Sequence, residues 1–127
     1  MHRILALTIL LSSQACSTQD AQIDQEPPSI TVRSPEEMGI YPAGEALSIE
    51  VTIRENLELH TYSVQLLHPA SQSTFTLQQQ HTHVQEVRFE QAFPLPPAKG
   101  ATYELVVQAD DHEGNAQEIR RTFMTAP

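Results

Sequence analysis

The strongest constraint on the fold is a strict alternation of apolar and polar residues between positions 47 and 54. The apolar residues are Leu47, Ile49, Val51 and Ile53, and the polar residues between and after them are Ser48, Glu50, Thr52 and Arg54. Successive side chains of a β-strand point to opposite faces, so a period of two places one face in a core and the other in water. No window of the chain sustains a helical period. The segment therefore predicts a half-buried β-strand.

The same alternation recurs along the chain at intervals of roughly ten residues. It is clear at residues 62–66 and 103–109, and weaker around Ile30 and Val32, Phe75 and Leu77, Val87 and Phe89, and Ile119 and Phe123. Turn-forming residues separate these segments, with Pro42-Ala43-Gly44 and Pro69-Ala70-Ser71 as examples. We therefore expect residues 29–127 to form an all-β domain. An immunoglobulin-like or fibronectin-III-like antiparallel β-sandwich of about seven strands fits this spacing.

The stretch 101–115 is the most informative part of this pattern. Tyr103 lies near the start of the penultimate strand, and there it resembles the tyrosine corner of immunoglobulin-like domains, whose phenol bonds to backbone upstream. The strand is expected to leave the sheet at Asp110, to turn through Gly114 and Asn115, and to return as the last strand.

The first 15 residues have the three-part layout of a secretory signal peptide. Arg3 gives a positive start, residues 4–11 are almost unbroken apolar, and small or polar residues follow up to Ala15. The apolar run is much shorter than the ~20 residues of a membrane-spanning helix. Cys16 comes next, as in bacterial lipoprotein signals, and we expect it to carry the lipid anchor, palmitate included. The alternative is plain secretion after the same cut, which leaves a free thiol with no second cysteine to pair with it.

Residues 16–28 are expected to form the lipidated cysteine and a disordered tether, because Ile23 is the one large apolar residue after Cys16. Pro27-Pro28 marks the boundary of the domain. A specific binding segment is the alternative. This layout predicts a protein of the cell envelope that is anchored to a bacterial membrane. We expect the outer membrane rather than the inner one, and a domain that faces the periplasm or the exterior.

Charge excludes one class of partner. The chain has 7 basic and 16 acidic side chains and a net charge of −9. Binding to nucleic acid or to anionic lipid headgroups needs a Lys/Arg face, which this balance opposes. We expect no nucleic-acid partner.

Residues 54–68 (RENLELHTYSVQLLH) carry a more specific resemblance. They resemble a family of small bacterial lipoproteins with an immunoglobulin-like domain, the domain of unknown function 4625 type. In that family a charged-Asn-x-Glu-Leu corner precedes a Tyr-Ser strand and a histidine-rich loop; the matching positions are Asn56, Glu58, Leu59, Tyr62, Ser63 and His68. Residues 69–80 of this chain contain no histidine, which departs from the family loop. The resemblance implies the sandwich and the anchor, and it carries no activity.

Histidine spacing suggests a transition-metal site. His81 and His83 are two residues apart, so both rings lie on one face of an extended strand, a geometry that suits Zn²⁺ or Cu²⁺. A third nitrogen is expected from His68 or His60 on the preceding strand, and we select His68. The other interpretation is a set of polar residues on an exposed edge.

Two acidic loops are expected to meet at one end of the sandwich. They contain Glu55, Asn56, Glu58, Asp110, Asp111 and Glu113. Loops at the ends of a sandwich are its usual binding surface, so these residues are our candidates for partner contacts. Converging oxygen ligands would also suit Ca²⁺, which we rank behind Zn²⁺ and Cu²⁺. The plainer interpretation is that Asp and Asn cap tight turns there.

No pattern supports catalysis. The chain has no nucleophile-elbow serine, its carboxylates lie outside apolar patterns that would raise a pKa, and its four glycines form no phosphate loop. We expect no enzyme and no resident cofactor, but a non-catalytic binding or structural module whose partner is an envelope protein or a glycan. The alternatives are a metal-binding protein that uses the histidines and an accessory subunit of an envelope complex.

Overall fold

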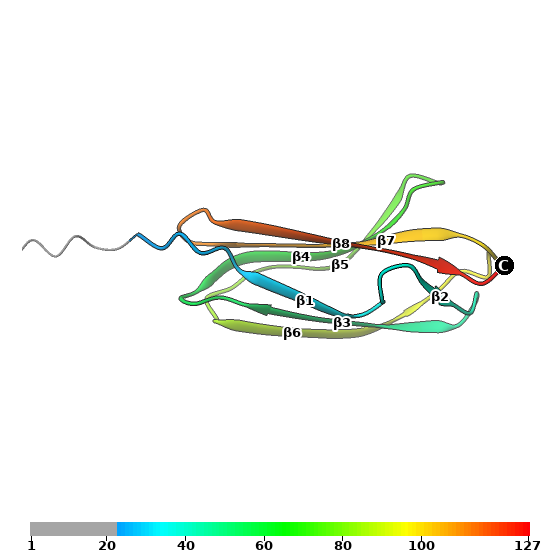
Figure 1. The fold of residues 1–127 in the computed structure, drawn as a ribbon, viewed down its shortest axis with the longest axis horizontal. Helices are drawn as coiled ribbons and strands as arrows, with labels where there is room; N and C mark the ends of the chain where they lie inside the picture. Colours follow the sequence, from blue (N-terminus) through cyan, green and yellow to red (C-terminus); the bar gives the residue numbers. More distant parts are fainter. Residues whose placement is uncertain (1–22) are drawn as a thin grey trace, which may run out of the picture.

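Two β-sheets packed face to face make up the described part of the chain, which covers residues 23–127 in this computed structural model (Figure 1). The predicted signal peptide, Cys16 and the start of the tether lie outside the described residues. The strands are β1 (Ser29–Ser34), β2 (Gly39–Tyr41), β3 (Ala46–Arg54), β4 (Leu59–His68), β5 (Ser73–His81), β6 (Glu86–Pro94), β7 (Thr102–Asp111) and β8 (Ala116–Thr125). Within residues 23–127, no helix has the length and apolarity that crossing a membrane requires.

The smaller sheet has the order β1-β3-β6 and the larger one β2-β8-β7-β4-β5. The pairings are antiparallel except for β2, which runs parallel to β8. The prediction of an all-β sandwich is confirmed. The described residues form eight strands rather than about seven, because the three residues of β2 are too few to show an alternation in sequence.

The core lies between the sheets and consists mainly of the alternating residues that the sequence indicated. Ile49 and Ile53 of β3 face Val64 of β4 and its neighbours, and all three are fully buried. Each such side chain contributes about 1.5–3 kcal/mol to the free energy of unfolding. Tyr103 is buried as well, and its ring stacks on that of Phe123 with the centroids 5.5 Å apart. Burial raises the pKa of the Tyr103 phenol. The hydrogen bond expected from the Tyr103 hydroxyl to backbone earlier in the chain remains a prediction.

An irregularity in β4 decides where His60 points. Leu59 pairs with Asp111 and Thr61 with Asp110, so the register shifts and His60 is an extra residue, a β-bulge. Strict alternation back from the buried Tyr62 would turn His60 inward and Leu59 outward. The bulge reverses this order: Leu59 is fully buried and His60 is partly exposed.

The loops between strands gather at the two ends of the sandwich. We call one of them the entry end, because residues 23–28 lie there, and the C-terminus lies at the opposite end (Figure 1). The entry end also carries the β3–β4 loop (residues 55–58), the β5–β6 loop (residues 82–85) and the β7–β8 loop (residues 112–115).

Candidate metal centre at the entry end

Four histidine rings meet at the entry end. His60 lies in the β4 bulge, His81 ends β5, His83 follows in the β5–β6 loop, and His112 begins the β7–β8 loop. Around the cluster, neighbouring ring centroids are 4.7 Å apart for His60–His81, 4.8 Å for His81–His83, 5.0 Å for His83–His112 and 4.7 Å for His112–His60. The rings thus form a closed circuit, which we call the histidine cluster.

The spacing of the histidine cluster suits a single metal ion. Two imidazoles bound to one tetrahedral ion, with N–metal bonds of about 2.0–2.1 Å, have ring centres roughly 5 Å apart. The rings of His83 and His112 lie almost parallel, with 7° between their planes. Both are exposed, so a rotation about their side-chain torsions is open to them and is needed to turn both nitrogens toward one ion.

Glu58 of the β3–β4 loop completes the group. Its Oε1 is 3.0 Å from His83 Nδ1 and 3.7 Å from His112 Nε2. One ligand atom from each of these three residues lies within 4.8 Å of the other two, so the group is able to hold a metal ion. A carboxylate on Nδ1 of a histidine also fixes its tautomer and leaves Nε2 free as the ligand, the usual arrangement behind metal-bound histidines.

The surroundings of His81 favour its neutral form, which is the form that binds a metal ion. The pKa of His81 is lowered, first by partial desolvation and then by His60, His83 and His112, because protonated rings so close together repel one another. A neutral imidazole has a free lone pair, which a metal ion needs. His81 is therefore disposed to bind a cation rather than a proton.

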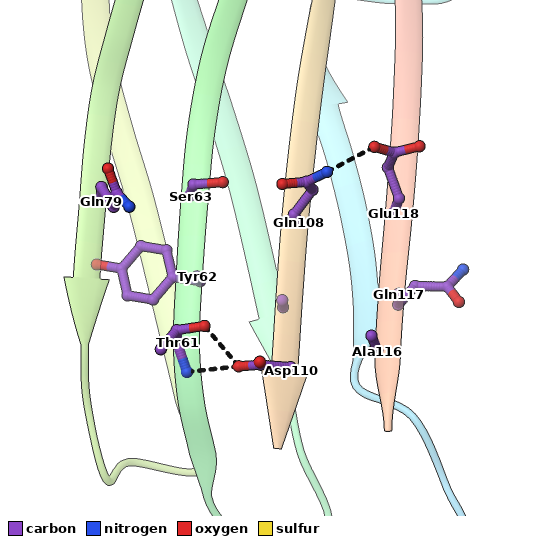
Figure 2. A pocket seen from close by; sticks show the side chains of 10 residues that line it. Thr61, Tyr62, Ser63, Gln79, Gln108, Asp110, Ala116, Gln117 and Glu118 are labelled. Atoms are coloured by element: carbon purple, nitrogen blue, oxygen red, sulfur yellow. Dashed lines mark hydrogen bonds between the residues drawn. The ribbon is translucent and has the colours of Figure 1, made fainter. Parts of the chain in front are cut away.

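Asp110 holds the bulge that presents His60. Its Oδ1 accepts hydrogen bonds from the Thr61 backbone N–H at 2.8 Å and from the Thr61 hydroxyl at 2.5 Å, as Figure 2 shows. A bulge leaves backbone groups without their ladder partners, and the Asp110 carboxylate replaces one of them. Asp110 thus acts on the histidine cluster by positioning His60.

A polar hollow lies beside the bulge, over β5, β4, β7 and β8 (Figure 2). Its side chains already bond to one another: Gln108 donates to Glu118 Oε1 at 2.7 Å, for example. The aromatic ring that lines it, Tyr62, is 7% exposed, so it offers little face for a ligand to stack on.

The structure brings together some of the residues that the sequence selected. His81 and His83 are neighbours, as their spacing indicated. His68 is not with them: it pairs with Ser73 at the other end of β4, stacks on Tyr103 at 5.0 Å and bonds to Ser71. The choice of His68 over His60 is wrong because the antiparallel pairing of β4 with β5 sets His81 opposite Thr61, next to His60, and leaves His68 at the far end of the strand.

The acidic loop residues divide by burial. Glu55 is 7% exposed and Asp111 is 2% exposed, so neither presents a surface to a protein or glycan partner, contrary to their selection as partner contacts. Asp110 is half-buried and supports the bulge. The remaining selected residues are exposed: Asn56, Glu58 and Glu113.

The sequence patterns did not identify two members of the histidine cluster. His112 had no role there and His60 was only the alternative to His68. A usable signal existed: in a sandwich of antiparallel strands, every second loop reaches the same end, and the loops at residues 55–58, 82–85 and 112–115, each with its neighbouring strand ends, do so here. A histidine in each of them predicts a meeting point.

The sequence of the chain matches one known protein family. Residues 14–124 match the family described as "Domain of unknown function (DUF4625)". The chain belongs to the DUF4625 family. The resemblance drawn from residues 54–68 is thereby confirmed at the level of the family. No curated protein matches the chain.

Two solved structures align with this DUF4625 domain to different degrees. A superoxide reductase (neelaredoxin) from Ignicoccus hospitalis aligns with a TM-score of 0.55 and 11% sequence identity, over 80% of this chain and 82% of that chain. A chitin binding domain from Burkholderia pseudomallei aligns with a TM-score of 0.46 and 15% identity, over 71% and 57% of the two chains. At these identities the first likeness supports the β-sandwich and nothing finer.

Proposed function

We propose that this DUF4625 protein is a non-catalytic metal-binding module of the bacterial cell envelope, held at a membrane through Cys16. Its ligand is a divalent transition-metal ion, Zn²⁺ or Cu²⁺. The observation that carries the proposal is the closed circuit of four imidazoles at the entry end, with ring centroids 4.7–5.0 Å apart around it.

The chemistry of the donors supports this class of ion. Imidazole nitrogens suit Zn²⁺ and Cu²⁺, and Cu²⁺ binds more tightly than Zn²⁺ to a given set of nitrogen donors. Glu58, His83 and His112 already have one ligand atom each within 4.8 Å of the other two. The rings of His60 and His81 lie next to them as further donors. A fourth donor from His60 or His81 would close the tetrahedral set, as in structural zinc sites, and this supports a role in holding the ion.

The test is isothermal titration of the purified chain with Zn²⁺ and with Cu²⁺. We expect one ion per chain, and a midpoint of thermal unfolding that rises by about 10 °C or more at a hundred times the dissociation constant. His83→Ala combined with His112→Ala removes two of the donors and should weaken binding at least about a hundredfold.

His68→Ala is the matched control, because His68 is a histidine on β4 that lies at the opposite end. Its affinity for Zn²⁺ should equal that of the parent chain. Equal affinity in the double variant, or a chain that binds neither ion, would contradict the proposal.

A further inference from the structure

Three carboxylates converge beside the histidine cluster, and the proposed function does not use them. They are Asp24, from the segment before β1, Glu55, which follows β3, and Asp111, the last residue of β7. One carboxylate oxygen of each lies within 4.8 Å of those of the other two. We call this group the acid cluster.

The acid cluster is withdrawn from water. Glu55 is 7% exposed and Asp111 is 2% exposed, and Asp24 is half-buried. Burial raises the pKa of Glu55, and the negative charges of Asp111 and Asp24 add to this effect. Buried carboxylates need a compensating partner, because the loss of hydration is costly. Exposed acidic loops of a soluble domain face no such cost.

Most oxygens of the acid cluster have such partners. Asn56 donates its side-chain N–H to Asp24 Oδ1 at 3.0 Å and its backbone N–H to Glu55 Oε1 at 2.9 Å. Asn115 donates its side-chain N–H to Asp111 Oδ2 at 2.7 Å and to the carbonyl of Asp24 at 3.0 Å. These bonds fix all three carboxylates in place.

Two oxygens of the acid cluster are left over. Glu55 Oε2 and Asp24 Oδ2 are buried and have no hydrogen-bond partner among residues 23–127. An unpaired buried oxygen is uncommon in folded proteins and calls for a specific explanation. Here both belong to carboxylates of one group, which the surrounding amides hold in position. A cation placed where the three carboxylates meet would give both oxygens a partner and would offset the negative charge of the group.

We infer that the acid cluster binds a calcium ion. The donors are carboxylate oxygens, which are the preferred ligands of Ca²⁺ and Mg²⁺. Zn²⁺ and Cu²⁺ are better suited to the imidazole nitrogens of the histidine cluster. Ca²⁺ accepts irregular sets of six to eight oxygens and takes waters among them, whereas Mg²⁺ demands near-ideal octahedral geometry. A hollow between Asp24, Asp111 and His112 gives room for such waters.

Calcium at this place would fasten the segment before β1 to the domain. Asp24 is the one ligand outside the sandwich, and Pro28, four positions on, is fully buried. The segment that the sequence assigned to the tether, residues 23–28, thus lies against the entry end. With the ion bound, it becomes part of the domain.

The experiment compares thermal unfolding of the full chain in a calcium chelator and in about 5 mM Ca²⁺, the range in which extracellular calcium sites fill. We expect the midpoint to rise by at least about 5 °C with Ca²⁺. It should rise less with Mg²⁺ at the same concentration. Glu55→Gln and Asp24→Asn should each remove most of the rise in midpoint that Ca²⁺ causes. Both substitutions keep the size of the side chain and an oxygen that can accept the hydrogen bonds from Asn56.

Glu113→Gln is the matched control, since Glu113 is an exposed acid of the adjoining loop, and it should keep the full shift. The His83→Ala, His112→Ala variant should also keep it, which separates this inference from the proposed zinc or copper site. No shift with Ca²⁺ in the parent chain would overturn the inference. So would a shift that survives in both Glu55→Gln and Asp24→Asn, because it would then come from other carboxylates.

Discussion

Replacing Phe123 by alanine is expected to destabilise the domain by about 3–5 kcal/mol, the cost of emptying a fully buried aromatic position. Phe123 of β8 is fully buried. Its ring stacks on Tyr103 at 5.5 Å and meets Tyr41 edge-on at 5.8 Å. The alanine would leave a cavity between these two tyrosines. The midpoint of thermal unfolding, followed by circular dichroism, should fall by more than about 10 °C.

Phe75→Ala is the control for this prediction. Phe75 also contacts another aromatic ring, that of Phe93 at 5.5 Å, but it is 42% exposed and lies on the edge strand β5. Its loss should cost about 1 kcal/mol or less, as is usual for exposed positions. If Phe123→Ala and Phe75→Ala lowered the free energy of unfolding by similar amounts, Phe123 would not be part of the core.

The second large effect concerns Asp110. Asp110→Ala removes the acceptor of the Thr61 N–H and hydroxyl, and so removes the support of the bulge at His60. We expect the affinity for Zn²⁺ to fall about tenfold to a hundredfold, although Asp110 is not a member of the histidine cluster. The affinity should be measured by titration at a temperature at which circular dichroism shows the variant to be folded.

Asp110→Asn keeps an oxygen at the same place and should restore most of the affinity. A purely electrostatic role would give a different result, because Asn and Ala both remove the negative charge. Equal losses in the two variants would therefore contradict a role for Asp110 in positioning His60.

The fold was predictable where a single physical rule governs the chain. The alternation at residues 47–54 is uninterrupted, and the structure pairs all of β3 with β6 without a register shift. Burial of one strand face is enough to produce such a pattern, so the sequence contains it in full. β2 was missed because three residues bonded to the edge of a sheet need no pattern of their own.

The candidate site was less predictable because it depends on a local exception. Spacing alone paired His81 with His83. The position of His60 depends on the bulge, which arises from a contact between Thr61 and Asp110, far apart in the sequence. His68 was the wrong choice for a different reason, because the register of the β4–β5 pair sets His81 opposite Thr61 and sets His68 opposite Ser73, at the other end of the strand.

The segment before β1 shows a further limit of composition. Residues 23–28 contain too little apolar surface to order themselves, and the sequence assigned them to the tether for that reason. In the structure Asp24 is held by polar contacts instead, from the side chains of Asn56 and Asn115. Contacts of this kind leave no periodic signal, because each depends on one side chain reaching a distant loop.

The wide separation of the acid cluster residues in the sequence affects how calcium acts on the rates of folding and unfolding. Asp24, Glu55 and Asp111 belong to segments far apart in the sequence, and contacts of that kind form late, after the sheets that align them. An ion that needs all three carboxylates has little to bind in the transition state for folding. Calcium is then expected to act almost wholly on the unfolding rate, lengthening the lifetime of the folded domain without hastening its formation.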